Sequence, residues 1–139
     1  MTPEEKTLVQ TTWKQVAPIA PAAADLFYQR LFEQAPEIES LFGKTDMTAQ
    51  KSRLIEAVSR TVAGLQDEDS LRTELTALGR RHAGYGVQDS HYESVGAALL
   101  WTLETGLGEG WSEEACRAWT QAYGFIARQM SEGAKRATG

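Results

Sequence analysis

The sequence predicts a single all-α domain. In several long segments, apolar residues recur three and four positions apart, the spacing that lines one face of a helix. No segment keeps the strict apolar–polar alternation of a half-buried strand. Prolines, glycines and capping residues separate these segments, so we expect about five long helices and one or two short ones.

The first two helices are marked by a cap and by prolines. Thr2 is followed by a proline and by Glu5, a pattern typical of a capping box at a helix start. Pro18 and Pro21 are expected to break or kink the chain before a second helix. That second helix has one polar member on its apolar face, Tyr28, whose phenol needs a hydrogen-bond partner if it is buried.

A short helical turn and a long helix come next. Pro36 begins the turn, which ends near Phe42, and a polar loop leads to two candidate caps, Asp46 and Thr48. The long helix is expected to run to about Gln66. Inside it, Gln50 stands one turn before Leu54 on the inward stripe, so this stripe also begins with a polar residue.

The stretch 71–87 carries the main candidate for chemistry. Three leucines ending at Leu78 form an apolar stripe, and the next position on that stripe is His82. Gly84 and Gly86 are then expected to end the helix. Two interpretations remain open on this pattern alone: a core histidine with a hydrogen-bond partner, or an axial ligand of heme iron.

The last two helices begin at predicted caps. Asp89 is expected to cap a helix that faces Tyr92 inward, and His91 in its first turn is expected on the surface. Ser112 caps the final helix, and the tail 133–139 is expected to fray. We therefore expect one domain over residues 1–139, with a core from about residue 4 to residue 132.

Composition excludes several classes of protein. The chain has 139 residues, is 42% hydrophobic and carries a net charge of −5, which argues for a globular domain and against a nucleic-acid partner. No apolar run approaches the ~20 residues of a membrane span, and the acidic start does not resemble a signal peptide. Cys116 is the only cysteine, so we expect a reducing, cytoplasmic location without a disulfide.

Four polar side chains stand on otherwise apolar stripes: Tyr28, Gln50, His82 and Tyr92. Burying such groups without partners costs about 1–3 kcal/mol each. Either they satisfy one another, or they surround a polar object. A heme iron with a bound diatomic ligand is one such object, with the histidine on one side and the phenol and amide on the other.

The sequence resembles the bacterial single-domain globins, similar to Vitreoscilla hemoglobin and to the globin domain of flavohemoglobins. The resemblance covers the chain from about Leu8 to Met130, and its specificity lies in the order of several pieces rather than in any one. Residues Tyr28, Phe42, Gln50, Leu54, His82 and Tyr92 succeed one another in the family's order. The matching stretches are LFYQRLF (26–32), APEIESLFG (35–43), GRRHAGYGV (79–87), HYESVGAALL (91–100) and AWTQAYGFIA (118–127).

The resemblance implies a globin fold that encloses heme b and assigns roles by position. His82 is the implied proximal iron ligand, with its Nδ1–H directed to a carbonyl or a nearby side chain. Tyr28 and Gln50 are the implied distal pair that donates hydrogen bonds to O2. The implied heme contacts are Phe42, Arg53, Leu54, Leu78, Val87 and Tyr92.

Simpler interpretations of four of these residues remain open. Phe42 is also a plain core aromatic, and Gln50 is also a first-turn residue that points into solvent. Arg53 is predicted either to pair with a heme propionate or to be a solvated surface charge. Tyr92 is either the family's proximal tyrosine or a core tyrosine with some other hydroxyl partner.

Two departures from the family pattern bear on activity. Flavohemoglobins place a glutamate on the last helix beside the proximal tyrosine and histidine, and the matching position here is Ala134. Peroxidase-like activation of the heme is therefore in doubt. No dinucleotide fingerprint such as GxGxxG is found, so any turnover is expected to need a separate reductase as electron donor.

The sequence supports three hypotheses about function. The first is reversible binding of O2, NO and CO by a monomer or weak homodimer. The second is nitric oxide dioxygenation, in which O2 and NO give nitrate, with weak peroxidase activity as a variant of it. The third is a globin-fold sensor or interaction module without heme, against which His82 argues.

Overall fold

The structure, a computed structural model, describes residues 1–138, and all regular elements among them are helices, with no strand. This confirms the all-α prediction, with six helices of at least 14 residues where about five were expected. In chain order the elements are α1 (Pro3–Val16), η1 (Ala17–Ile19), α2 (Ala20–Gln34), α3 (Pro36–Glu39), η2 (Ser40–Phe42), α4 (Met47–Ala63), α5 (Glu68–Gly84), α6 (Asp89–Leu107), η3 (Gly108–Gly110) and α7 (Glu113–Thr138).

Most predicted helix caps are confirmed. The Thr2 hydroxyl accepts from the Glu5 amide at 3.1 Å, while the Glu5 carboxylate accepts from the Thr2 amide at 2.8 Å, which completes the capping box. The predicted cap Asp46 accepts from the Thr48 amide at the start of α4, and Asp67, for which no cap was predicted above, caps α5 in the same way. Ser112 accepts from an amide in the first turn of α7 at 3.0 Å. These caps satisfy amides that have no partner inside the helix.

The predicted cap at Asp89 is wrong, because α6 begins one residue earlier than expected and includes Asp89. Gln88 occupies the cap position, and its backbone N–H donates to Nδ1 of His91 at 3.0 Å. The Asp89 carboxylate instead accepts a hydrogen bond from the Ser131 hydroxyl on α7 at 2.8 Å. A long-range contact thus uses the side chain that local pattern assigns to the helix end.

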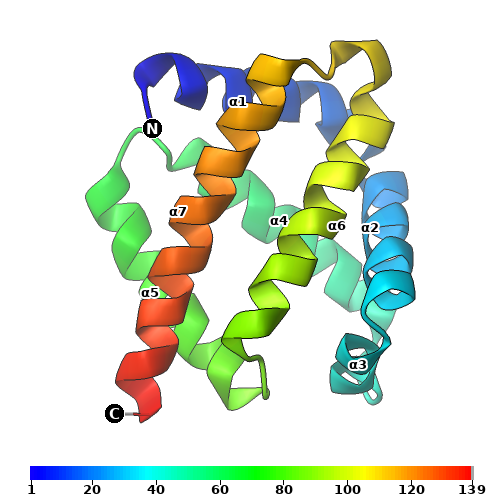
Figure 1. The fold of residues 1–139 in the computed structure, drawn as a ribbon, viewed down its shortest axis with the longest axis vertical. Coiled ribbons are helices and arrows are strands. Elements are labelled where there is room, and N and C mark those ends of the chain that lie inside the picture. Colours follow the sequence, from blue (N-terminus) through cyan, green and yellow to red (C-terminus); the bar gives the residue numbers. More distant parts are fainter. Residues whose placement is uncertain (139) are drawn as a thin grey trace.

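Helices from both halves of the chain pack directly against one another. Figure 1 shows α6 and α7 side by side, with α1 across their upper ends, α4 passing behind them, and α2 with α3 at one edge. Direct contacts join α7 to α1, α5 and α6, and join α2 to α4 and α6. The predicted site residues lie mainly on α2, α4 and α5, so the site is assembled from helices far apart in the sequence.

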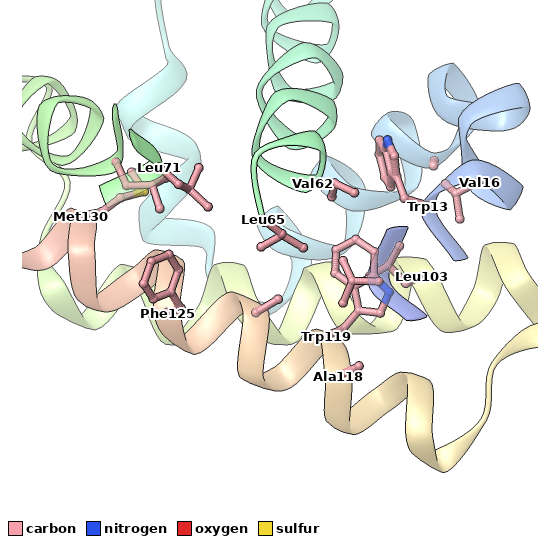
Figure 2. Close-up of a cluster of buried hydrophobic side chains, with 14 residues drawn as sticks. Trp13, Val16, Val62, Leu65, Leu71, Leu103, Ala118, Trp119, Phe125 and Met130 are labelled. Carbon is pink, nitrogen blue, oxygen red and sulfur yellow. The ribbon is translucent and has the colours of Figure 1, made fainter. Parts of the chain in front are cut away.

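The larger core cluster lies between α1, α4, α5, α6 and α7. Its buried members include Trp13 on α1 and Trp119 on α7, whose ring centroids are 6.2 Å apart (Figure 2). Both indole nitrogens find partners: Trp119 donates to the Thr12 hydroxyl at 2.8 Å, and Trp13 donates to the Ser59 hydroxyl at 3.1 Å. The core therefore buries large aromatic area without leaving these donors unsatisfied.

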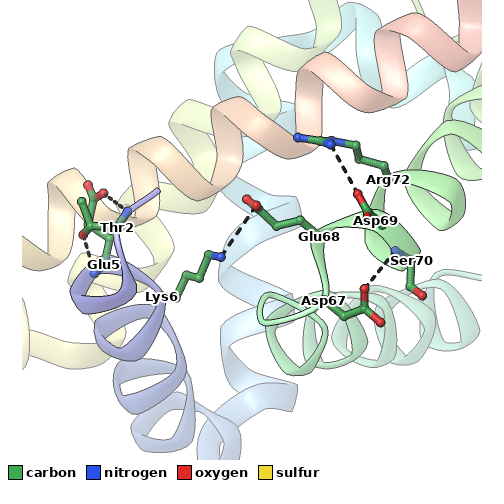
Figure 3. A network of polar contacts seen from close by, with 8 residues as sticks. All are labelled: Thr2, Glu5, Lys6, Asp67, Glu68, Asp69, Ser70 and Arg72. Carbon is green, nitrogen blue, oxygen red and sulfur yellow. Dashed lines mark hydrogen bonds and ion pairs between the residues drawn. The ribbon is translucent and has the colours of Figure 1, made fainter.

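Ion pairs at the edge of the molecule add little to this packing. Lys6 on α1 reaches Glu68 at the start of α5 at 3.8 Å, and Arg72 reaches Asp69 at 3.6 Å (Figure 3). Surface pairs of this kind, here at 3.6 and 3.8 Å, contribute at most about 1 kcal/mol. The position of α5 is accordingly set by its contact with α7 rather than by these charges.

Helices α5 and α7 touch backbone to backbone at two glycines. A Cβ on Gly79 would overlap the carbonyl group of Met130, and a Cβ on Gly133 would overlap that of Thr76. Each glycine therefore receives the main chain of the other helix. Residues 133–138 form the last part of α7, and Gly139 lies outside the described residues; the fraying of this tail stays a prediction.

No helix in the described part of the chain is long and apolar enough to cross a membrane. This agrees with the absence of a long apolar run in the sequence.

Gly79→Ala is expected to destabilise the protein by more than about 2 kcal/mol, because the added methyl group meets backbone that cannot move aside. Gly124→Ala is the matched control, since nothing lies within 4 Å of its Cβ position in the interior of α7. There alanine is expected to stabilise by about 0.5–1 kcal/mol. Denaturant unfolding of both variants measures the difference, and equal effects would contradict the backbone contact.

Candidate functional site

The end of α5 fixes the chain around His82. Gly86 has a φ of 93°, in the left-handed region that favours glycine. The Val87 amide donates to the His82 carbonyl at 3.1 Å, and the Gly86 amide donates to the Ala83 carbonyl at 3.1 Å. These two bonds form a Schellman motif, which ends the helix at Gly84, two residues after the histidine. The predicted glycine stop is confirmed.

The His82 imidazole is held as a neutral ring. Its Nδ1 lies 2.9 Å from the carbonyl oxygen of Leu78, and since a carbonyl only accepts, Nδ1 carries the proton. Burial lowers the pKa of His82 below its usual value. Among the described residues none bonds to Nε2, which is not sealed off either. The ring thus presents an unprotonated Nε2, the form that binds a metal.

Tyr28 on α2 is buried in an aromatic cluster. Its side chain is 4% exposed, and its ring centroid lies 4.9 Å from that of Phe27 and 5.7 Å from those of Phe32 and Phe42. Burial raises the pKa of the Tyr28 phenol, and a hydrogen bond from Gln50 opposes part of that effect. The hydroxyl therefore keeps its proton at neutral pH and is available as a donor.

Gln50 and Arg53 on α4 continue from Tyr28 as a chain of hydrogen bonds. The Nε2 of Gln50 donates to the Tyr28 hydroxyl at 3.1 Å, and Nη2 of Arg53 donates to the Oε1 of Gln50 at 3.0 Å. Lys51 and Asp25 form an ion pair at 2.9 Å that also joins α4 to α2. Gln50 is half-buried, so it does not simply point into solvent.

Tyr123, to which the sequence analysis assigned no role, contacts Tyr92. The hydroxyl of Tyr123 on α7 donates to the carbonyl oxygen of Tyr92 at 2.6 Å. Gly96 leaves room for that ring, because a Cβ there would lie 2.7 Å from Cε2 of Tyr123. Burial raises the pKa of both tyrosines. The signal that would have marked Tyr123 is the one that marked Tyr28, a phenol on an apolar stripe.

The remaining predicted site residues lie around these groups. Phe42 and Leu54 pack against the cluster that contains Tyr28, while Leu78 and Tyr92 pack against the larger core. Arg53 is exposed. The five predicted apolar and aromatic contacts are all half-buried: Phe42, Leu54, Leu78, Val87 and Tyr92.

The structure thus forms two groups rather than one. Tyr28, Gln50 and Arg53 are joined by hydrogen bonds, and His82 is bonded to its own helix. No hydrogen bond or ring contact between described residues links His82 to the Tyr28–Gln50 pair. A group that binds to Nε2 of the histidine and reaches the phenol would connect the two. A small apolar cavity of about 20 Å³ also lies beside Phe27 and Leu54.

The structure combines three features in an all-helical fold. His82 is a neutral histidine whose Nε2 has no partner among the described residues, and Tyr28 and Gln50 form a phenol–amide pair on two other helices. These residues fit heme b, which takes a single axial imidazole and packs against apolar side chains: His82 offers the imidazole, and Phe42 and Leu54 are half-buried apolar groups. The model of the globin family matches residues 25–130, so the chain belongs to the globin family.

Comparisons with individual proteins agree with this assignment. The chain is 31% identical over 129 residues to the flavohemoprotein of Rhizobium meliloti (strain 1021), covering 91% of this chain and 32% of that protein. It thus spans about a third of the flavohemoproteins that it matches. It is 28% identical to neuroglobin of Chaenocephalus aceratus, covering 94% of this chain and 90% of that protein.

A solved structure supports the fold. A hexacoordinated heme protein from an anhydrobiotic tardigrade superposes with a TM-score of 0.86, covering 97% of this chain and 96% of that one. The sequence identity is 21%, so this likeness concerns the fold alone. The globin prediction made from the sequence is confirmed, whereas the roles of individual residues remain predictions.

His82→Ala is expected to lose most of its heme, because no other described residue offers an unprotonated imidazole at the end of α5. Heme retention is measured by the Soret absorbance that remains after gel filtration of the heme-loaded protein. His91→Ala is the control: that ring caps α6, and the variant is expected to retain heme. Unchanged retention in His82→Ala would remove His82 as the ligand.

Proposed function

We propose that this globin binds heme b through His82 and reversibly binds O2, as well as NO and CO, under the control of Tyr28 and Gln50. Heme iron, when bound, supplies an open coordination position for a diatomic ligand. The chain's own residues then decide how long the ligand stays. We propose the function for a cytoplasmic monomer or weak homodimer.

The observation that supports this proposal best is the direction of hydrogen bonding at Tyr28. Its oxygen accepts from Gln50, and no described residue accepts the hydroxyl's own proton. A buried donor without an acceptor is costly, by about 1–3 kcal/mol. A diatomic ligand with negative charge on its oxygen atoms satisfies that donor. Tyr28 is therefore prepared for a ligand rather than for another side chain.

The other site residues have supporting roles in the proposal. Leu78 supplies the carbonyl that orients the imidazole of His82. Phe42, Leu54 and Val87 are half-buried apolar groups that would contact the porphyrin faces and keep water away.

Tyr28→Phe is expected to raise the O2 dissociation rate by about 10-fold or more, since a hydrogen bond to a charged acceptor contributes about 1.5–3 kcal/mol. Stopped-flow displacement of O2 from the reduced protein measures this rate. Tyr85→Phe is the matched control, because Tyr85 is 71% exposed and lies at the end of α5. An unchanged rate in Tyr28→Phe would mean that the phenol does not donate to the ligand.

Nitric oxide dioxygenation is the second candidate function, favoured by the same donor pair. In that reaction one O2, one NO and one electron give one nitrate ion. Tyr28 and Gln50 would retain O2 until NO arrives, and a reductase would supply the electron. The relatives named flavohemoproteins are about three times as long as the matched region, so a reductase partner for this chain is part of the proposal.

Mixing the O2-loaded protein with NO is expected to give about one nitrate per heme and then stop. Continued turnover is expected only when a reductase and its electron donor are added. Ion chromatography of nitrate measures both phases. Carriage of O2 remains the function if nitrate formation with a reductase does not exceed one per heme.

A further inference from the structure

We propose that Arg53 is a positioning residue that fixes the orientation of the Gln50 amide and, through it, the direction in which Tyr28 donates its proton. The inference rests on the proposed ligand-binding function and deepens it. It is carried by the chain of two hydrogen bonds from Arg53 to Gln50 at 3.0 Å and from Gln50 to Tyr28 at 3.1 Å.

Arg53 determines which end of the Gln50 amide faces it. The oxygen and the NH2 group of a glutamine are nearly equal in shape, so packing does not distinguish them. A guanidinium has five N–H donors and no acceptor. The atom of Gln50 that meets Arg53 must therefore be Oε1, which leaves the NH2 group facing Tyr28.

The NH2 group of Gln50 in turn determines the role of Tyr28. An amide NH2 only donates, so the oxygen of Tyr28 is the acceptor in that bond. The phenol proton cannot then point at Gln50. It points elsewhere in buried surroundings, where no described residue accepts it, which leaves it for the ligand.

Without Arg53, the Gln50 amide gains a second orientation, with Oε1 toward Tyr28 and the NH2 group toward solvent. Tyr28 then donates to Gln50, a bond as good as the one it replaces, and the ligand loses its donor. Arg53 thus selects between two arrangements of equal shape, and only one of them leaves the phenol proton available to a ligand.

The surroundings leave Arg53 free for this task. Gln50 and Arg53 stand three residues apart on α4, so they share one face of the helix. Arg53 takes part in none of the ion pairs of the described residues, whereas Lys51 beside Gln50 is paired with Asp25. The guanidinium is therefore not drawn away by a carboxylate.

The test is a double-mutant cycle on O2 dissociation. Arg53→Met is expected to raise the dissociation rate about 3- to 10-fold, less than Tyr28→Phe, because the correct amide orientation is still partly populated. Arg53→Lys retains a cation that only donates, so it is expected to restore most of the slow rate. In a Gln50→Leu background, Arg53→Met is expected to have no further effect. Arg60→Met is the control on the same helix, since Arg60 pairs with Glu74 instead.

Two spectroscopic readouts separate orientation from a general structural role. In the CO complex, Arg53→Met is expected to shift the C–O stretching frequency upward, toward that of Tyr28→Phe, because the ligand loses a donor. Hydrogen exchange at the Gln50 side-chain amide is expected to become faster, because that group turns to solvent. Neither readout is expected to change in Arg60→Met.

The outcomes are distinguishable. If Arg53→Met raises the rate equally in the Gln50→Leu background, Arg53 acts on the ligand or on a heme propionate directly, and the inference is overturned. If Tyr28→Phe leaves the rate unchanged, the proposed function of the distal pair fails as well. A rate that rises in Tyr28→Phe but stays unchanged in Arg53→Met overturns the positioning role alone.

Discussion

The contact between the backbones of α5 and α7 is the constraint on which the site depends. Gly79 and Gly133 remove the two Cβ atoms that would keep these helices apart, so each helix rests on the main chain of the other. His82 lies three residues after Gly79 on the same helix, and the imidazole then bonds to the carbonyl of Leu78 within that helix. Helix packing therefore sets the position of Nε2, and the bond to Leu78 leaves the imidazole little freedom to rotate.

The imidazole of His82 and the phenol of Tyr123 both form hydrogen bonds to backbone carbonyl groups. The imidazole donates to Leu78, and the phenol of Tyr123 donates to Tyr92. A neutral carbonyl raises the basicity of a histidine less than a carboxylate does. Because Ala134 occupies the position where the resemblance places a glutamate, this side lacks that carboxylate. This difference is one reason to propose reversible ligand binding ahead of chemistry that needs strong donation of electrons from the proximal side.

The sequence predicted local structure well wherever the cause was itself local. The caps at Thr2 and Asp46 and the glycine stop after His82 depend on residues within one turn, and all are present. Asp89 was assigned the wrong role because its carboxylate bonds to Ser131, 42 residues away. The reciprocal glycines could not be predicted either, since a glycine inside a helical segment indicates local weakness until its partner helix is known.

The distal side shows the same limit at the level of single atoms. The resemblance implied that Tyr28 and Gln50 act together as a distal pair; the structure joins the two side chains by a hydrogen bond, and their role toward a ligand stays a prediction. For Arg53 the sequence offered a heme propionate or a solvated surface charge; the side chain is exposed, and it also donates to Gln50. The i, i+3 spacing on α4 permits that bond without requiring it. In the folded chain the Arg53 guanidinium, which only donates, contacts the Gln50 amide. This contact fixes which end of the amide faces Tyr28.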